Sequence, residues 1–177
     1  MRQIGVPFEV VVPEVDETPL AEELAGDFVS RLALDKARQG EQLARERGLI
    51  DLPVLGADTC IVLDNEILGK PSDREHGVTM LQRLAGHSHE VLTGIAIVTQ
   101  NDEYMAISRN RVTFGPMSDE EIAAYWDTGE PAGKAGAYAL QGRAAAYIER
   151  IEGSYSAIVG LPLFDVVRIL KKLGISV

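Results

Sequence analysis

Cysteine and histidine are scarce in this chain of 177 residues. Cys60 is the only cysteine, so no disulfide can form within the chain, which is typical of proteins in a reducing cytoplasm. His76, His87 and His89 lack the spacing of a metal-ligand set, and no cysteine pair supplements them. Neither a Walker-type phosphate loop nor a Gly-x-Ser-x-Gly nucleophile elbow occurs. The common zinc, P-loop and serine-hydrolase sites are therefore excluded.

Positive charge is also in short supply. Lys and Arg number 17 against 27 Asp and Glu, which gives a formal net charge of −10. Proteins that bind nucleic-acid polymers broadly need an excess of cations facing the phosphates, so this class of partner is excluded. A small anionic ligand remains compatible, because it needs only a few local cations or a metal ion held by carboxylates.

Long apolar runs are missing as well. No segment approaches the roughly 20 apolar residues that span a bilayer, and the N-terminus does not have the pattern of a signal peptide. We therefore expect a cytoplasmic protein without a membrane partner. Apolar residues make up 46% of the chain, enough for a sizeable core, and the length suits one domain over residues 1–177.

Strand and helix patterns are mixed along the chain, which predicts an α/β (α+β) domain with a central mixed sheet flanked by helices. The first strand is predicted at Phe8–Val12, rich in β-branched residues and ended by Pro13. Helical spacing of apolar residues predicts a helix over 25–47, ended by Gly48. By similar criteria, strands are predicted over 53–57, 60–63, 67–68, 90–99, 104–114 and 145–151, and helices over 73–84, 118–127 and 162–173, two of them opened by capping patterns at Ser72 and Ser118.

Asp58 directly follows the apolar run 53–57. Open α/β sheets place their sites at the carboxyl ends of strands, so Asp58 is a candidate functional carboxylate. A turn-forming aspartate that caps Thr59 or the next amide is the equally supported alternative.

Two glycine-containing loops supply candidate ligand contacts. Gly69 lets backbone approach a ligand and Pro71 fixes the loop, so Lys70 between them can be a positioned cation. The alternative is an ordinary surface turn with an exposed lysine. In the Gly/Ala-rich segment 133–142, Gln141 carries an amide that matches the edge of uracil or thymine, where a carbonyl lies beside an N–H. The alternative here is a loop whose small residues serve packing.

An acidic loop contains Glu14, Asp16 and Glu17. A pair of carboxylates can hold Mg²⁺ or Mn²⁺, which prefer hard oxygen ligands and often bridge to phosphates. A solvated acidic turn is the alternative. Lys36 lies near the apolar face of the predicted helix over 25–47, where a lysine either points into a site or extends along the surface to water.

Taken together and in order, these segments resemble the Maf family of nucleoside triphosphate pyrophosphatases over almost the whole chain. Several spaced motifs carry the resemblance. The matching stretches are Val15-Asp16-Glu17-Thr18, Arg31-Leu32-Ala33 with Lys36-Ala37, Gly56-Ala57-Asp58-Thr59, Leu68-Gly69-Lys70-Pro71, Leu81 with Leu84-Ala85-Gly86 and His89, Thr93-Gly94, Gly129-Glu130-Pro131, Lys134-Ala135-Gly136-Ala137-Tyr138, Gln141-Gly142, Gly153-Ser154-Tyr155 and Val159-Gly160-Leu161-Pro162.

The resemblance implies an enzyme that hydrolyses nucleoside triphosphates between the α and β phosphates, with a divalent metal ion, Mg²⁺ or Mn²⁺. It also implies the mixed, helix-flanked sheet of inosine triphosphate pyrophosphatases, and often a homodimer. Carried over to this sequence, it implies that Asp58 is a general base or metal ligand and that Glu17 assists with metal or water. Lys36, Lys70 and Lys134 are implied to neutralise the triphosphate and the departing pyrophosphate.

The resemblance extends to the choice of base. Members that act on dTTP and UTP resemble this chain at Ala57-Asp58-Thr59 and at Tyr138-Ala139-Leu140-Gln141-Gly142. Members that act on 7-methyl-GTP typically carry Ser-Asp-Gln at the first place and Glu in place of Gln141, because a carboxylate accepts from the guanine N–H groups. Thr59 and Gln141 therefore predict dTTP and UTP as substrates, with a 7-methyl-GTP pyrophosphatase as the alternative.

One family segment has no counterpart in this sequence. Family members normally begin with a strand, a Ser-Pro-Arg-Arg motif and a helix that runs into Leu-x-x-Ile-Gly. Met1-Arg2-Gln3-Ile4-Gly5 resembles the end of that helix, so the first strand and the arginine motif are expected to be missing here. The arginines are expected to grip phosphate bidentately. An alternative function is therefore a catalytically weakened nucleotide-binding or regulatory protein linked to cell division.

Overall fold

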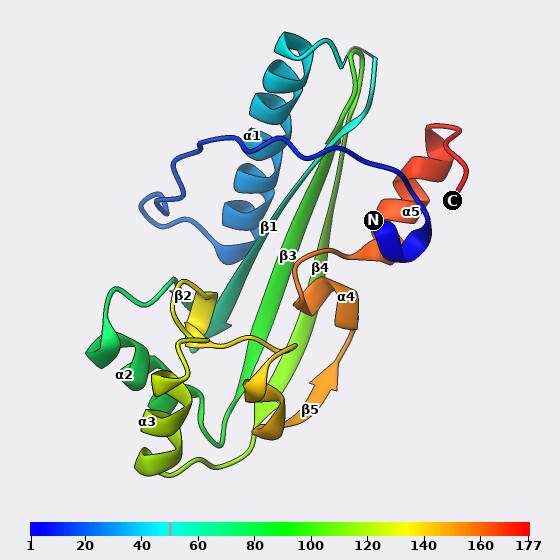
Figure 1. Cartoon of the computed structure of the whole chain (residues 1–177). Coiled ribbons are helices and arrows are strands. Elements are labelled where there is room, and N and C mark those ends of the chain that lie inside the picture. The colour runs from blue at the N-terminus through cyan, green and yellow to red at the C-terminus, as the bar shows by residue number, and fades with distance from the viewer. Residues whose placement is uncertain (50) are drawn as a thin grey trace. The chain divides into compact units, whose positions relative to one another are not determined.

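The computed structural model describes residues 1–49 and 51–177, which fall into two compact units (Figure 1). Unit 1 comprises Met1–Asp58, Thr93–Ser108 and Gly160–Val177, and unit 2 comprises Thr59–Leu92 and Arg109–Val159. Each unit has a buried apolar cluster of its own. The helices are α1 (Ala25–Glu46), α2 (Arg74–Leu84), α3 (Asp119–Asp127), α4 (Tyr155–Ile158) and α5 (Leu163–Lys172), with 3-10 turns η1 (Arg2–Ile4), η2 (Ala135–Ala137) and η3 (Arg143–Ala146).

The described strands form a five-stranded sheet in the order β2-β1-β3-β4-β5. β1 and β2 pair antiparallel across a turn at Asp64 and Asn65, which both have positive φ, and β4 and β5 also pair antiparallel. Figure 1 shows β3 and β4 running in opposite directions. The helix-flanked sheet is confirmed, but its strands are antiparallel rather than mixed, and short turns join β1 to β2 and β3 to β4. The strands are β1 (Val54–Leu63), β2 (Glu66–Leu68), β3 (Ser88–Val98), β4 (Glu103–Phe114) and β5 (Ile148–Glu152).

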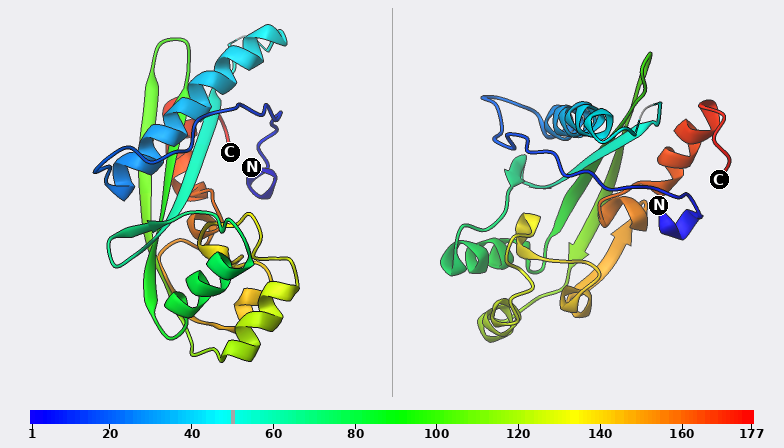
Figure 2. Two further views of the ribbon diagram at one scale, coloured as in Figure 1. Left: turned by 90° about the vertical axis from the view of Figure 1, so that its left-hand side faces the viewer. Right: turned by 45° about the horizontal axis from the view of Figure 1, so that its top comes forward.

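In unit 1, α1 and α5 cover opposite faces of β3 (Figure 2). Ala96 and Val98 pack with the alanines of α1, whereas Ile95 and Ile97 pack with the apolar side of α5. Successive side chains of a strand point to opposite faces, so this alternation assigns one helix to each face. The helix predicted over 25–47 is confirmed within one residue at its end, and Gly48 follows it with φ 77°.

Two glycines let α1 lie directly on the strands. A Cβ atom at Gly56 of β1 would overlap the carbonyl oxygen of Ala33 and lie 2.6 Å from the backbone nitrogen of Ala37. A Cβ atom at Gly94 of β3 would lie 2.5 Å from the carbonyl oxygen of Val29. These neighbours are backbone atoms that cannot rotate away, so a larger residue would push α1 off the sheet. The two glycines therefore determine how closely α1 packs on β1 and β3.

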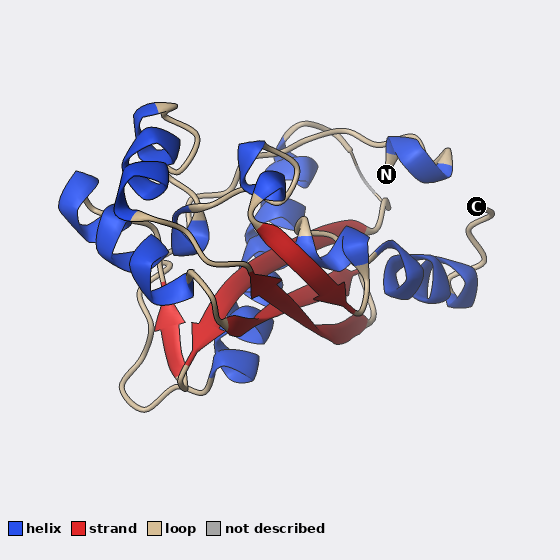
Figure 3. Ribbon diagram, turned by 90° about the horizontal axis from the view of Figure 1, so that it is seen from below, coloured by secondary structure: helices blue, strands red, loops and turns tan. Residues whose placement is uncertain are grey.

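The N-terminal segment also belongs to unit 1. Met1 packs against the cluster of Ile95 and Ile97, to which α5 also contributes, and Figure 3 shows η1 and α5 at the same end of the picture. The strand predicted at Phe8–Val12 is wrong, because this segment lies outside the sheet and lines an apolar groove of about 530 Å³ instead. Val10 and Val12 are exposed, at 67% and 76%. β-Branched residues favour extended backbone, but a strand also needs a neighbouring edge with which to pair.

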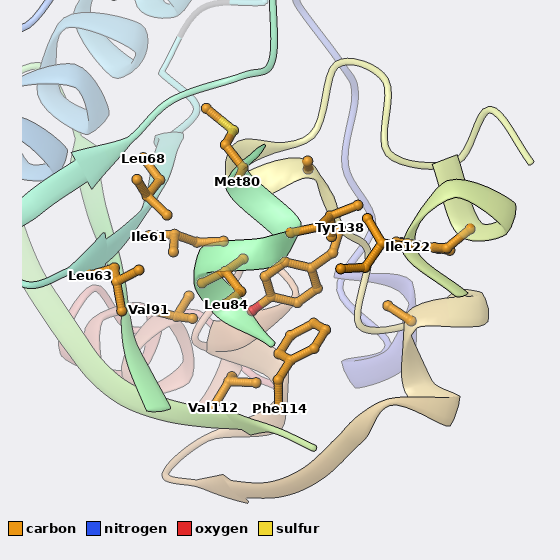
Figure 4. Packing of buried hydrophobic residues seen from close by; sticks show 14 of the residues in the cluster. Ile61, Leu63, Leu68, Met80, Leu84, Val91, Val112, Phe114, Ile122 and Tyr138 are labelled. Carbon is orange, nitrogen blue, oxygen red and sulfur yellow. The ribbon is translucent and has the colours of Figure 1, made fainter. Parts of the chain in front are cut away.

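Unit 2 has a core formed by the lower parts of the long strands together with α2 and α3 (Figure 4). The rings of Phe114 and Tyr138 meet edge to face, with centroids 5.0 Å apart. The capping box at Ser118 is confirmed: its Oγ accepts from Glu121 N, and Glu121 Oε2 accepts from Ser118 N at 2.8 Å. The cap of α2 is Asp73 rather than the expected Ser72, since Asp73 Oδ1 accepts from His76 N at 2.8 Å.

The strand predicted over 145–151 is displaced towards the C-terminus. η3 occupies Arg143–Ala146, and β5 covers Ile148–Glu152. No helix within the described residues has both the length and the apolar composition needed to cross a membrane.

Candidate active site

Asp58 and Lys36 meet in unit 1, between β1 and α1. Lys36 Nζ lies 2.6 Å from Asp58 Oδ1 and 2.7 Å from Glu17 Oε1. The close approach of α1 to Gly56 brings Lys36, next to Ala37, within reach of the strand. Asp58 lies inside β1 rather than after its end, so its predicted place in the strand was wrong. Three residues that the sequence suggested separately thus form one cluster, which we call the Asp58–Lys36–Glu17 trio.

The charges of the trio support one another. Partial burial lowers the pKa of Lys36, but hydrogen bonds from its ammonium to Asp58 and Glu17 outweigh this effect and hold the pKa above its ordinary value. Lys36 therefore carries its charge at neutral pH. The Asp58 side chain is 11% exposed and that of Glu17 is 41% exposed, so one carboxylate is largely shielded while the other faces solvent.

The donor set of the trio fits a divalent cation. Oxygens of Asp58 and Glu17 both reach the single ammonium group of Lys36, so both also converge on a place suited to a hard cation. Mg²⁺ is commonly held by one or two carboxylates, with water and substrate phosphates completing its coordination. Within the part of the chain that the structure describes, no group of three His, Cys, Asp or Glu side chains could hold a metal ion. Asp58 and Glu17 are the two carboxylates of this cluster that could hold such an ion.

The loop that carries Glu17 is anchored to α1 by a paired contact. Arg31 Nε lies 2.7 Å from Glu23 Oε1, and Arg31 Nη2 lies 2.7 Å from Glu23 Oε2. Arg31 Nη2 also donates to the carbonyl of Thr18, and Glu23 Oε2 accepts from Leu20 N. Such two-pronged contacts fix orientation as well as distance. The Arg31–Glu23 clamp therefore holds the backbone that follows Glu17.

Two carboxylates of the acidic loop, Asp16 and Glu17, make different contacts. Glu17 contacts Lys36, whereas Asp16 Oδ1 accepts from Thr18 N at 2.9 Å. Hydrogen bonds from the side chain and backbone of Thr18 hold the pKa of Asp16 below its ordinary value. Asp16 thus shapes the loop, and Glu14 is exposed. The metal-ligand candidate from this loop is Glu17.

The Arg31–Glu23 clamp makes stability depend on pH. The hydrogen bond from Arg31, supported by Leu20 N–H against the effect of burial, lowers the pKa of Glu23 from 4.5 to about 2. A lowered carboxyl pKa contributes stability that is present above 4.5 and is lost as pH falls towards 2. We therefore expect Glu23→Gln to lower the thermal midpoint most near neutral pH, and the gap from wild type to close as pH falls through that range.

Thermal melts followed by circular dichroism between neutral and acid pH measure this gap. Glu22→Gln makes the same chemical change at the neighbouring, exposed position and should track wild type throughout. A gap for Glu23→Gln that stays constant with pH would contradict an ionised clamp.

Unit 2 holds the remaining predicted contacts. Lys70 is exposed just after β2, and Lys134 and Gln141 are exposed on the loop that surrounds η2. Gly136 N donates to the carbonyl of Gly69 at 3.0 Å, which joins the two loops directly. Thr59, half-buried, is the first residue of unit 2 and follows Asp58 along β1. The structure thus brings the Lys70 loop and the Lys134–Gln141 loop together.

Two supporting contacts escaped the sequence patterns. Gln141 Nε2 donates to the hydroxyl of Tyr155 at 3.2 Å. His89 Nε2 lies 2.8 Å from the hydroxyl of Tyr138, and burial lowers the pKa of His89 to about 4, so this histidine is a neutral core residue. Both contacts join residues far apart in sequence, where spacing gives no signal. The family motifs containing His89 and Tyr155 were the only hint.

Comparison with known proteins identifies the class to which this fold and cluster belong. The sequence profile of the family described as Maf-like protein matches residues 1–173, and the chain belongs to the Maf family. A protein of Alkalilimnicola ehrlichii named dTTP/UTP pyrophosphatase is 49% identical over 177 residues, covering 99% of this chain and 87% of the relative. A dTTP/UTP pyrophosphatase of Symbiobacterium thermophilum is 50% identical over 98% of this chain and 87% of its own length. One from Methylococcus capsulatus is 45% identical over 99% and 85%.

Proposed function

We propose that this chain hydrolyses dTTP and UTP to the nucleoside monophosphate and pyrophosphate. One water molecule is consumed and the anhydride bond between the α and β phosphates is broken. The observation that carries the proposal is the Asp58–Lys36–Glu17 trio, with its contacts of 2.6 and 2.7 Å, in a chain of the Maf family. Relatives that carry the name dTTP/UTP pyrophosphatase are 45–50% identical over nearly the whole chain, which supports the same substrates here.

Each member of the trio has a distinct part in the proposed reaction. Asp58 accepts a proton from the attacking water or orients that water, and its shielded position favours a directed contact. Glu17 and Asp58 together bind a divalent ion, Mg²⁺ or Mn²⁺, which when bound would lower the pKa of water and neutralise phosphate charge. Lys36 neutralises the phosphates and the charge that develops on pyrophosphate as it leaves. Its retained ammonium charge supports this role.

The resemblance to the family supplies the other proposed substrate contacts. Lys70 and Lys134 are exposed cations on loops, as phosphate neutralisation requires. Gln141 presents its amide to the base, where one oxygen accepts from the ring N–H and one N–H donates to a carbonyl. Thr59 contributes to the same choice through its place beside Asp58. The proposal also includes a cytoplasmic location and a homodimer, both of which rest on the resemblance to the family.

The substrate choice is tested with a panel of nucleotides. Pyrophosphate release is measured with dTTP, UTP, CTP and 7-methyl-GTP in the presence of Mg²⁺ or Mn²⁺. We expect kcat/KM for dTTP and UTP to exceed that for the other two by about a hundredfold, because a mispaired polar group in a binding site is costly. Equal turnover of all four nucleotides would contradict the assignment, and turnover of 7-methyl-GTP alone would favour the other branch of the family.

Gln141→Glu tests the proposed base contact directly. The carboxylate retains the acceptor but loses the N–H donor, so kcat/KM for dTTP should fall about tenfold to a hundredfold. Gln42→Glu makes the same change on the exposed surface of α1 in unit 1 and should leave the kinetics unchanged.

A chain that dTTP stabilises thermally, without release of pyrophosphate, would instead be a nucleotide-binding protein with weakened catalysis.

A further inference from the structure

Behind the Lys134–Gln141 loop, the Glu130 carboxylate receives three hydrogen bonds. Tyr125 Oη donates to Oε1 at 2.7 Å, and the backbone N–H groups of Arg143 and Ala144 donate to Oε2 at 2.9 Å and Oε1 at 3.3 Å. Tyr125 Oη in turn accepts from Ala139 N at 3.3 Å. Backbone groups on both sides of Gln141 are therefore tied to one carboxylate and its tyrosine partner.

The chain makes room for this contact at Gly142. A Cβ atom on Gly142 would overlap the carboxylate of Glu130 at its carbon and both oxygens. The φ of Gly142 is −108°, a value open to any residue, so the space and not the backbone angle requires glycine. Gly142 directly follows Gln141. The absence of a side chain at 142 thus lets Glu130 reach the backbone immediately beside the proposed base-reading residue.

The protonation states agree with this arrangement. Burial opposes ionisation of Glu130, but hydrogen bonds from Arg143 N–H, Tyr125 and Ala144 N–H outweigh it and lower the pKa. Burial and the neighbouring Glu130 raise the pKa of Tyr125, so the phenol keeps the proton that it donates. Tyr125 is only 2% exposed, and water competes little for these bonds. Glu130 is therefore an ionised carboxylate that accepts hydrogen bonds from three donors.

We propose that Glu130 is a positioning residue for base recognition: with Tyr125 it fixes the backbone around Gln141 so that the Gln141 amide is presented to a pyrimidine in one orientation. An amide that is free to turn would pair with cytosine as well as with uracil or thymine, since these bases differ by exchange of donor and acceptor. Selectivity therefore needs a rigid support: the hydrogen bond from Gln141 Nε2 to the Tyr155 hydroxyl at 3.2 Å holds the amide, and Glu130 with Tyr125 holds the backbone from which Gln141 extends. This role rests on the pyrophosphatase activity proposed above. Within that activity, Glu130 acts on substrate choice and not on the chemical step.

Glu130→Gln is the test, assayed by pyrophosphate release from dTTP and from CTP in the full chain. The new amide turns an N–H group towards a donor, so the hydrogen bonds that hold the backbone around Gln141 weaken. We expect KM for dTTP to rise about tenfold and the ratio of kcat/KM for dTTP over CTP to fall about fivefold, because hydrogen bonds to charged groups are the stronger ones. The value of kcat should stay within about threefold, because the substitution leaves unchanged the Asp58–Lys36–Glu17 trio that is proposed to carry the chemical step.

Matched variants separate positioning from stability. Glu121→Gln makes the same change in the capping box of α3, also in unit 2, where the carboxylate accepts from Ser118 N. It should lower the thermal midpoint without changing KM or selectivity. Gly142→Ala retains every hydrogen-bonding group but displaces the carboxylate, and should reproduce the kinetics of Glu130→Gln. Tyr125→Phe removes one donor and should give a smaller change in the same direction, which serves if Glu130→Gln does not fold.

The outcomes distinguish this role from the proposed function. A wild-type chain that does not prefer dTTP over CTP overturns the proposed function and this inference with it. A selective wild type whose Glu130→Gln and Gly142→Ala variants remain equally selective overturns the inference alone. A fall in thermal midpoint with unchanged KM in both variants also overturns the inference alone, because Glu130 would then contribute only to stability.

Discussion

Asp58→Asn is expected to lower kcat for pyrophosphate release from dTTP about a thousandfold, in the range of lost general acid–base catalysis. Asparagine has nearly the same shape, but it cannot accept a proton and is a poorer ligand for a hard cation. The Lys36 ammonium, which lies 2.6 Å from Asp58 and 2.7 Å from Glu17, would retain one charged partner. The fold should therefore persist, and the loss should appear in kcat more than in KM.

Asp35→Asn provides the matched control for Asp58→Asn. Asp35 lies next to Lys36 on α1, and its half-exposed carboxylate is 3.9 Å from Arg31 Nη1. An exposed pair of this kind contributes little, so activity should stay within about twofold of wild type. Initial rates at saturating dTTP and Mg²⁺, with thermal melts of all three proteins, give the comparison. Turnover by Asp58→Asn equal to that of Asp35→Asn would remove Asp58 from the chemistry.

Gly56→Ala is expected to lower the free energy of unfolding by about 3 kcal/mol, at the upper end of overpacking effects. The new methyl group would overlap the carbonyl oxygen of Ala33 and crowd the nitrogen of Ala37, and these backbone atoms cannot turn aside. α1 must then move away from β1, and Lys36 moves with it. For a chain of this length the thermal midpoint should fall by about 10 °C, and activity should fall even at temperatures where the variant is folded.

Gly115→Ala is the matched control for Gly56→Ala, because a methyl group has room at position 115 but not at position 56. A Cβ atom at Gly115 would meet only the carbonyl oxygen of Tyr147 at 3.6 Å, an ordinary contact. This substitution should change stability by less than about 1 kcal/mol, within the range of compatible glycine replacements. Thermal melts and dTTP turnover of both variants are the measurement. If Gly56→Ala behaved like Gly115→Ala, the close seating of α1 would not be what places Lys36.

Local patterns in the sequence predicted the local structure well. The apolar spacing of α1 and the glycine after it marked the helix within one residue at its end. The Ser118 pattern gave a complete capping box, because both of its hydrogen bonds join residues three apart. Asp64 and Asn65 lie between the strands predicted over 60–63 and 67–68 and form the turn there, since such residues tolerate positive φ. In each case the information lay in residues close together in the sequence.

Longer-range relations were beyond the same patterns. The segment Phe8–Val12 has the composition of a strand, but composition cannot say whether a partner edge is near. Asp58 was placed at a strand end because the apolar run paused there, whereas β1 continues to Leu63. The Arg31–Glu23 clamp and the hydrogen bonds from Arg143 and Ala144 to Glu130 depend on tertiary approach. The family motifs named Glu17, Lys36 and Asp58 together, but the ammonium between two carboxylates became visible only in three dimensions.

The ammonium of Lys36 is a counter-ion for the two carboxylates of the trio. Two carboxylates near one point repel each other, and Lys36 reduces their combined charge from two negatives to one. Under the proposed function, a cation entering between Asp58 and Glu17 would exchange with this ammonium, so the two positive charges would compete for the same oxygens. Metal affinity measured without nucleotide would then include the work of that exchange, and a phosphate that received the released ammonium would reduce it. Metal and nucleotide would thereby each strengthen the binding of the other through one lysine.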